Sequence, residues 1–128
     1  MNTPFMVNLG LDNYGADYLG ICYDSGHGNF LEGSGLDWLE PRKERLISLH
    51  LHDNDGASDQ HKIPFTGIVD WDRLTRIIAA SPYNKAVNLE CSIHKPGIAM
   101  ETDFLAKSLE AAKKIEAMIE KAKSETSA

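Results

Sequence analysis

The chain has 128 residues, of which 42% are hydrophobic and 25% charged, as is typical of one folded domain with a sizeable core. Its formal net charge of −6 excludes a general electrostatic attraction for polyphosphate, so we do not expect a nucleic-acid partner. No stretch approaches the ~18 apolar residues of a membrane span, and no basic segment followed by an apolar core opens the chain. We therefore expect a cytoplasmic protein without a membrane role.

Short apolar runs alternate along the chain with segments of helical spacing. In chain order the patterns predict a helix at residues 5–14, a strand at 18–23, a helix at 36–45, a strand at 46–51, a helix at 71–80, a strand at 86–91 and a long helix at 102–123. The strand runs are continuously apolar, which is typical of parallel strands that are covered on both faces. The alternation therefore predicts an α/β fold with a parallel sheet.

The last two predicted helices each have an apolar face. Asp70 is suited to cap the helix at 71–80. That helix places four apolar side chains on one side: Trp71, Leu74, Ile77 and Ile78. The helix at 102–123 carries an apolar stripe that we interpret as a packing face: Leu105, Leu109, Ala112, Ile115, Ile119 and Ala122. Cys22 and Cys91 lie inside apolar strand runs, and we interpret both as reduced, structural thiols.

Each predicted strand ends in residues that bind metals in proteins. Asp24 and His50 lie at the ends of the first two strands, and Glu90 lies at the end of the third. Because the C-terminal ends of parallel strands share one edge of a sheet, these side chains are expected to converge. One imidazole and two carboxylates suit Mn²⁺, Zn²⁺, Co²⁺ or Mg²⁺ better than a metal that prefers thiolates. The sequence therefore predicts a divalent-metal site formed by these three residues.

A second polar group lies close by in the sequence. His27 follows Asp24 by three residues, and Asp59 and His61 lie in the polar loop after the second strand. For Asp59 and His61 a metal-binding role and a solvated turn are both open interpretations. His52 is expected to face the side of its strand opposite to His50, towards the helices, and we interpret it as structural.

Four segments together resemble the xylose isomerase-like TIM barrel superfamily, which holds sugar phosphate isomerases and epimerases and, more distantly, endonuclease IV (AP endonuclease family 2). The segments are CYDSGHGN at residues 22–29, LHLHDNDGASDQH at 49–61, GIVDW at 67–71 and NLEC at 88–91. The resemblance implies a (β/α)₈ barrel, of which this chain would hold the last three or four βα units.

The resemblance also implies roles for single residues. Asp24, His50 and Glu90 correspond to metal ligands, Glu90 also acts in proton transfer, and His27 contacts the substrate and takes part in catalysis. His61 is a further candidate substrate contact. In the endonuclease-like branch the counterparts of His27, Asp59 and His61 hold a further zinc ion, so Asp59 and His61 are also candidate metal ligands.

The implied reaction is the isomerisation or epimerisation of a sugar or sugar phosphate. The divalent ion would bind the carbonyl and the neighbouring hydroxyl of a ketose and stabilise the enediolate formed by proton transfer. In the sugar epimerases a second glutamate precedes an Asn-Thr-Pro segment, whereas Met1 precedes Asn2-Thr3-Pro4 here. A complete barrel has roughly 250 residues, so we expect residues 1–128 to be its C-terminal portion and the site to be incomplete.

Two alternatives stay open beside the sugar enzyme. One is a metal-dependent phosphodiesterase of the endonuclease IV kind, which would hold two or three ions rather than one. The other is a non-catalytic half-barrel that serves as an assembly module, so whether this chain alone is an enzyme is left open. Exposed strand edges and apolar surface favour association, either with a second copy or with a missing N-terminal half.

Overall fold

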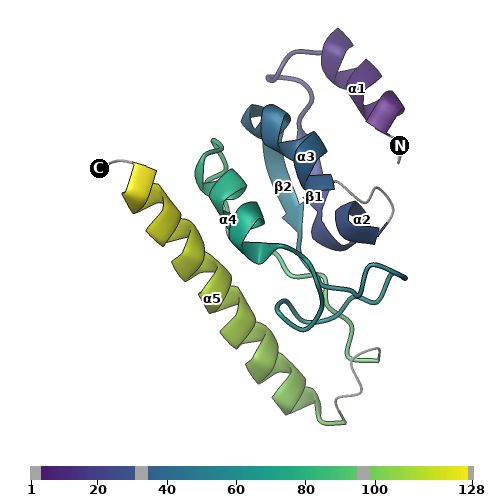
Figure 1. The fold of residues 1–128 in the computed structure, drawn as a ribbon, viewed down its shortest axis with the longest axis vertical. Helices are drawn as coiled ribbons and strands as arrows, with labels where there is room; N and C mark the ends of the chain where they lie inside the picture. The colour runs from purple at the N-terminus through teal and green to yellow at the C-terminus, as the bar shows by residue number, and fades with distance from the viewer. Residues whose placement is uncertain (1–3, 31–34, 95–98, 127–128) are drawn as a thin grey trace.

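The computed structural model describes residues 4–30, 35–94 and 99–126 of the chain, in which helices alternate with two short strands (Figure 1). The elements are α1 (Pro4–Asn13), β1 (Ile21–Asp24), α2 (Ser25–Phe30), α3 (Gly35–Leu39), the 3₁₀ helix η1 (Glu40–Arg45), β2 (Leu46–His50), α4 (Trp71–Ala79) and α5 (Glu101–Thr126). The mixture of helices with a parallel sheet agrees with the expected α/β class. Within the described residues, no helix combines the length and the apolarity needed to cross a bilayer.

The sheet is smaller than predicted. β1 and β2 pair in parallel and bring Asp24 level with His50. The strand expected at 86–91 is reduced to one parallel bridge, Leu51 to Leu89. Upstream of that bridge, the side-chain amide of Asn88 donates to the Leu49 carbonyl at 3.1 Å, in the place where a backbone N–H would continue the ladder. The structure therefore shows two paired strands and a third segment whose backbone pairs with them through a single bridge, next to Glu90.

The single helix that the sequence predicts at residues 36–45 is divided in the structure into two short helices. α3 ends at Leu39 and the chain continues as the 3₁₀ helix η1, which has Pro41 in its first turn. Proline lacks a backbone N–H, so it cannot extend the hydrogen-bond ladder of a preceding α-helix. The break follows from this one residue, and it lets Arg45 reach back to the carbonyl oxygens of Leu19 and Tyr14.

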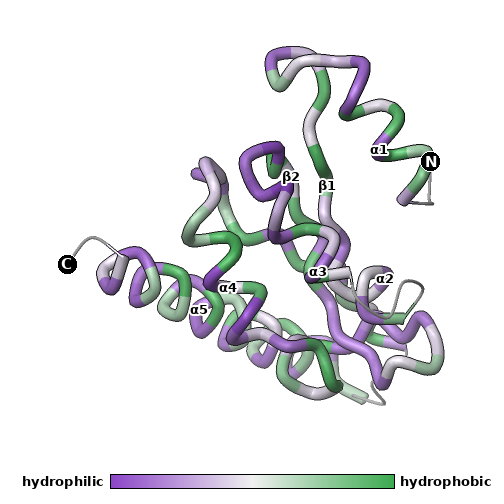
Figure 2. Tube along the Cα trace, turned by 45° about the horizontal axis from the view of Figure 1, so that its top comes forward, coloured by the Kyte–Doolittle hydropathy of each residue, from purple (hydrophilic) through white to green (hydrophobic). Residues whose placement is uncertain are grey.

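The core lies between one face of the sheet and helices α4 and α5. Leu49 and Leu51 of the second strand region are fully buried, as are Leu74 of α4 and Ile115 of α5. The predicted face of α4 is confirmed, because its four apolar residues are all buried. Asp70 caps the helix by accepting a hydrogen bond from the Arg73 backbone N–H at 2.9 Å, also as predicted. Hydrophobic and hydrophilic residues alternate along α5 in Figure 2, as expected of a helix with one packed face.

The predicted stripe of α5 is right only in its second half. Ile115, Ile119 and Ala122 are buried, whereas Leu105 is 64% exposed and Leu109 is 56% exposed. α4 has nine residues and α5 has 26, so the first half of α5 runs past the end of its partner helix. Sequence periodicity identifies an apolar stripe, but the length of the neighbouring element decides how much of it is covered.

Both cysteines are free thiols, and Cys91 is half-buried. Cys22 is exposed, although its apolar run is typical of a strand that is covered on both faces. Ile21 and Tyr23 face the helices and are buried, and successive side chains of a strand point to opposite faces. Cys22 therefore lies on the face of the sheet that no described element covers.

Candidate metal centre

The C-terminal ends of the two strands place Asp24 and His50 side by side, and the bridge at Leu89 brings Glu90 next to them. The Glu90 backbone N–H donates to the Leu51 carbonyl at 2.9 Å, which fixes where its side chain begins. His50 Nδ1 lies 3.1 Å from Glu90 Oε2. One ligand atom from each of Asp24, His50 and Glu90 lies within 4.8 Å of the others. The three residues that were expected to converge do so, and their binding of a metal stays a prediction.

His52 belongs to the same cluster, and the expectation that it faces away from it is wrong. Its side chain is fully buried, and its Nε2 lies 3.0 Å from Asp24 Oδ1. Residues two apart on an extended strand share a face, so His52 follows His50 towards the site rather than towards the helices. The signal was therefore present in the His50-Leu51-His52 spacing, and a correct reading of strand periodicity would have found it.

Small residues at the start of α2 accommodate the His52 ring. A Cβ atom on Gly26 would lie 1.9 Å from His52 Cε1, so only glycine fits there. The Ser25 hydroxyl donates to the His52 carbonyl at 2.6 Å and accepts from the His52 backbone N–H at 2.9 Å. The Ser25-Gly26 pair, directly after Asp24, thus fixes His52 against the carboxylate.

The second polar group also comes together in space. His27 Nδ1 lies 3.2 Å from Asp24 Oδ2, and its Nε2 lies 3.7 Å from Asp59 Oδ2. His61 Nε2 lies 3.1 Å from the same Asp59 oxygen. The His61 ring stacks on His52 with centroids 4.0 Å apart. His27, Asp59 and His61 are thus continuous with the strand-end cluster, and a second set of ligand atoms within 4.8 Å is formed by His52, His61 and Glu90.

A buried carboxylate holds the loop that carries Asp59 and His61. Asp53 is fully buried, and its two oxygens accept four hydrogen bonds of 2.8–3.1 Å. The donors are the backbone N–H groups of Asn54, Phe65 and Val69 and the indole N–H of Trp71. Backbone bonds in both directions between Asp53 and Lys62 then fix the residue that follows His61. The GIVDW segment at 67–71 therefore helps to hold this loop in place, through the hydrogen bonds that Val69 and Trp71 donate to Asp53.

Contacts within the cluster shift the pKa values of Asp24 and His52 in opposite directions. Burial by itself raises the pKa of Asp24, but the contact with His52 and the hydrogen bond from the His27 backbone N–H outweigh it, so the pKa lies below its ordinary value. Burial by itself lowers the pKa of His52, but the Asp24 carboxylate outweighs it and raises that pKa. Without a metal, the pair favours an ionised carboxylate beside a protonated imidazole.

The donor set fits a divalent metal ion. The two overlapping groups share Glu90 and offer only imidazole nitrogens and carboxylate oxygens, which Zn²⁺ and Mn²⁺ accept together. Within the described ranges, His52 Nδ1 has no hydrogen-bond partner, and His52 Nε2 has only its contact with the Asp24 carboxylate at 3.0 Å. Buried polar atoms usually have a partner, and for an imidazole that partner is often a metal ion. Asp24, His50, His52 and Glu90 are the residues that could hold it.

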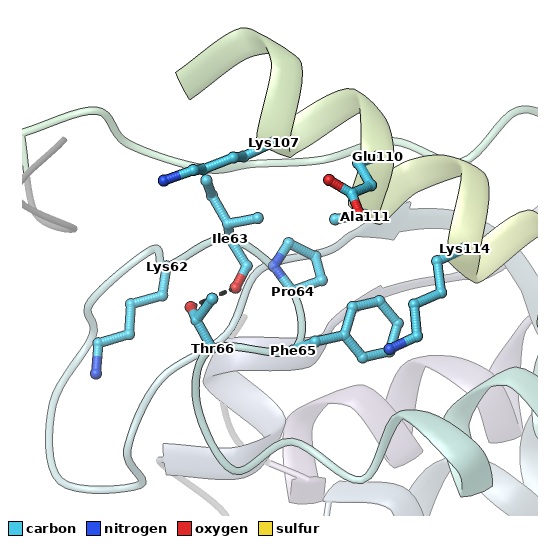
Figure 3. Close-up of a pocket in the computed structure, with 9 residues that line it drawn as sticks. All are labelled: Lys62, Ile63, Pro64, Phe65, Thr66, Lys107, Glu110, Ala111 and Lys114. Carbon is cyan, nitrogen blue, oxygen red and sulfur yellow. Dashed lines mark hydrogen bonds between the residues drawn. The ribbon is translucent and has the colours of Figure 1, made fainter. Parts of the chain in front are cut away.

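A separate groove of about 470 Å³ lies between residues 62–66 and α5 (Figure 3). Its floor is apolar, and Lys62, Lys107 and Lys114 stand at its edges. The Lys114 ammonium group lies 3.8 Å from the centre of the Phe65 ring, a cation–π contact. None of the candidate ligands lines this groove, so it is distinct from the cluster.

Comparison with known proteins identifies related sequences. The family model described as xylose isomerase-like TIM barrel matches residues 11–121. A curated relative, described as uncharacterized protein y4fM of Sinorhizobium fredii (strain NBRC 101917 / NGR234), is 38% identical over 110 residues. The match covers 86% of this chain and 35% of the relative, so the chain spans about a third of the length of the curated protein it matches. No solved structure matches the chain.

Proposed function

The chain belongs to the xylose isomerase-like TIM barrel family, and on that premise we propose that its strand-end cluster binds a divalent metal ion for the isomerisation or epimerisation of a sugar or sugar phosphate. The observation that carries the proposal is the convergence of Asp24, His50, His52 and Glu90 from three separate segments of the chain. Mn²⁺, Zn²⁺, Co²⁺ and Mg²⁺ are the candidate ions, because all accept mixed nitrogen and oxygen ligands.

The exposed parts of the cluster are suited to a polar substrate. When bound, the cation would polarise a sugar carbonyl and its neighbouring hydroxyl and so acidify the C–H bond between them. The Glu90 carboxylate is half-exposed beside His50 and would take that proton on a carboxylate oxygen. His27 is also half-exposed, and its contact with Asp24 holds the ring where it would donate to a sugar hydroxyl. His61 would provide a further hydroxyl contact.

Calorimetric titration of the purified chain with each of the four ions tests the metal centre. We expect Asp24→Asn to weaken binding at least about tenfold, whereas Asp12→Asn, which alters an exposed carboxylate of α1, leaves the affinity unchanged. Equal affinity in the wild type and Asp24→Asn would contradict the metal centre.

The sugar chemistry has its own test. The metal-loaded chain is incubated with ketoses and ketose phosphates in D₂O, and hydrogen exchange at the carbon beside the carbonyl is followed by NMR. Exchange that is lost in Glu90→Gln supports the proposed proton transfer. A chain that binds the metal and catalyses no exchange with any of these sugars would argue against the sugar class.

A metal-dependent phosphodiesterase is the second candidate, and the grouping of His27 and His61 around Asp59 favours it. Such enzymes place two or more ions on the reacting phosphate. The stoichiometry from the same titration separates the candidates: one ion per chain supports the sugar enzyme, and two or three support phosphodiester hydrolysis.

A further inference from the structure

Glu90 has less support from the sheet than the other strand-end ligands. Asp24 and His50 lie at the ends of two paired strands, whereas the segment of Glu90 pairs with the sheet through the single bridge between Leu51 and Leu89. The Glu90 backbone N–H forms part of that bridge by donating to the Leu51 carbonyl at 2.9 Å. The place of the Glu90 carboxylate in the cluster therefore depends on further contacts outside the sheet.

His61 makes two of those contacts. Its ring Nδ1 lies 2.7 Å from the Glu90 carbonyl oxygen, and its own carbonyl accepts a hydrogen bond from the Ser92 backbone N–H at 2.9 Å. A carbonyl oxygen only accepts, so Nδ1 carries the hydrogen in this contact. One residue of the loop after β2 thus holds the chain on both sides of Cys91.

The backbone of His61 has a conformation that few residue types adopt. Its φ of 49° lies in the left-handed region, which histidine and asparagine adopt more often than most residues with a side chain. The next residue, Lys62, exchanges two backbone hydrogen bonds with the buried Asp53 at 2.8 and 2.9 Å, and these fix the chain beside the turn. In this conformation both the ring and the carbonyl group of His61 reach the segment of Glu90.

The His61 ring is also held at its other edge and on one face. It stacks on the His52 ring with centroids 4.0 Å apart and planes inclined by 9°. Its Nε2 lies 3.1 Å from Asp59 Oδ2. A ring that is fixed at both nitrogens and packed on a buried neighbour has little freedom to rotate, so it is suited to hold another group in place.

We propose that His61 is a positioning residue for Glu90, which holds through Nδ1 the backbone from which the Glu90 carboxylate enters the cluster. The inference rests on the proposed metal centre for its functional meaning, and it gives the Nδ1 edge of the ring a role of its own. Groups that orient a metal ligand raise the affinity of the site without touching the ion, because the ligand loses less freedom on binding. Metal affinity should therefore depend on the hydrogen bond that His61 donates, and not on its imidazole as such.

Two substitutions separate the donor from the imidazole. His61→Asn places an amide N–H near the position of Nδ1 and no group near the position of Nε2, and asparagine tolerates the left-handed backbone. His61→Gly adopts the same backbone without strain and has no side-chain donor. Because both variants lack the imidazole, a difference between them reports the contact with Glu90.

Amide hydrogen exchange of the metal-free chain, followed by NMR, tests whether His61 holds the segment. We expect the Ser92 amide to exchange at least about fivefold faster in His61→Gly than in the wild type, and within about twofold of the wild type in His61→Asn. The Leu74 amide, which donates to the Asp70 carbonyl in α4, is the internal control and should exchange at the same rate in all three proteins. Equal exchange of Ser92 in the two variants, or an equal acceleration of Ser92 and Leu74 in His61→Gly, would overturn the proposal.

Calorimetric titration of the same proteins with Zn²⁺ tests the effect on the metal centre. His61→Gly should raise the dissociation constant at least about fivefold, and His61→Asn should restore it to within about twofold of the wild type. Equally weakened binding in both variants would show that the imidazole itself is the ligand, and it would overturn the positioning role. A wild type that binds none of the four candidate ions would contradict the proposed metal centre instead, and the exchange rates of Ser92 would still decide whether His61 holds the Glu90 segment.

Discussion

His52 Nε2 lies 3.0 Å from Asp24 Oδ1, so the buried imidazole and the carboxylate at the end of β1 form one unit of the candidate centre. His52 approaches from the residue pair that follows β2, through the space left by the missing side chain of Gly26. This relationship adds a histidine to the three ligands that the sequence suggested, and it makes the contributions of His50 and His52 separable by experiment.

Replacing His52 should weaken metal binding more than replacing His50. His52 is buried against Asp24, whereas His50 is half-exposed and paired with Glu90. A buried ligand that is held in place loses little entropy on binding, and its removal cannot be compensated by a mobile neighbour. We expect His52→Gln to reduce the affinity for Zn²⁺ at least about tenfold and His50→Gln to have the smaller effect. Isothermal titration of both variants measures the difference, and the reverse order would show that His50 is the dominant imidazole.

In the metal-free protein, His52 should titrate above its ordinary pKa of 6.5, because the Asp24 contact outweighs burial. Its Cε1 proton shift, followed by NMR from pH 5 to 9, should therefore have a midpoint above 6.5. Asp24→Asn removes the strongest influence that raises the pKa of His52, so the midpoint should fall from its wild-type position. A midpoint that is equal in both proteins would show that the two groups do not interact in solution.

The same two shifts contribute to the way the stability of the metal-free fold depends on pH. The folded pKa of His52 is raised, so its contribution is fully present below 6.5 and is lost as the pH rises through the folded pKa. The folded pKa of Asp24 is lowered, so its contribution is present above 3.8 and is lost as the pH falls through the folded pKa. Urea unfolding should therefore show a contribution of the pair between about pH 4 and 6.5 that Asp24→Asn removes. An identical pH profile of Asp24→Asn would contradict it.

The buried carboxylate of Asp53 should be far more important for stability than the exposed carboxylate of Asp55. Asp53→Asn replaces one acceptor oxygen with an NH₂ group that faces donors, so at least one buried N–H loses its partner. We expect a loss of about 2–4 kcal/mol in the free energy of unfolding. Asp55→Asn is the control at an exposed position of the same loop. Its carboxylate accepts from the Ala57 backbone N–H and the Gln60 amide in contact with water, so we expect a much smaller loss than for Asp53→Asn. Equal urea midpoints for the two variants would show that the Asp53 network does not stabilise the fold.

The sequence predicted which side chains converge better than it predicted the sheet. Strand ends can be recognised because apolar runs stop at polar residues, and the shared edge of parallel strands then implies that Asp24 and His50 meet. The extent of pairing is different. Residues 86–91 are strand-like in composition but pair with the sheet through the Leu51–Leu89 bridge, whose backbone hydrogen bonds are made by Asn88 and Glu90. His52 was expected on the wrong face of its strand, because residues two apart on a strand share a face. Its burial depends on close contact with Gly26, which the sequence alone does not show.

The two cysteines should differ in reactivity, although they occur in similar apolar runs. Burial, followed by the negative charges of Asp53 and Glu90, raises the pKa of Cys91 to about 12, so its thiol stays protonated at neutral pH. The Cys22 thiol is exposed on the open face of the sheet. Iodoacetamide at pH 8 should therefore modify Cys22 first, and Cys91 should react at least about a hundredfold more slowly. Mass spectrometry of Cys22→Ser and Cys91→Ser gives the two rates, and rapid modification of the Cys22→Ser variant would show that Cys91 is accessible as a thiolate.

Truncation of α5 side chains should reveal where the helix is packed. Ile115 is fully buried against the core, whereas Leu109, six residues earlier on the same predicted stripe, is 56% exposed beyond the end of α4. Ile115→Ala removes buried methyl groups and leaves a cavity, so we expect a loss of about 2–5 kcal/mol in the free energy of unfolding. Leu109→Ala removes surface that already contacts water, and it should change that free energy by less than about 0.5 kcal/mol. Chemical denaturation measures the free energy of unfolding of both variants. Both introduce an alanine into the same helix, so the helix propensity of the new residue is the same in each. A large loss for Leu109→Ala would mean that the first half of α5 packs against something in solution, and the contrast between the two halves of the stripe would then be wrong.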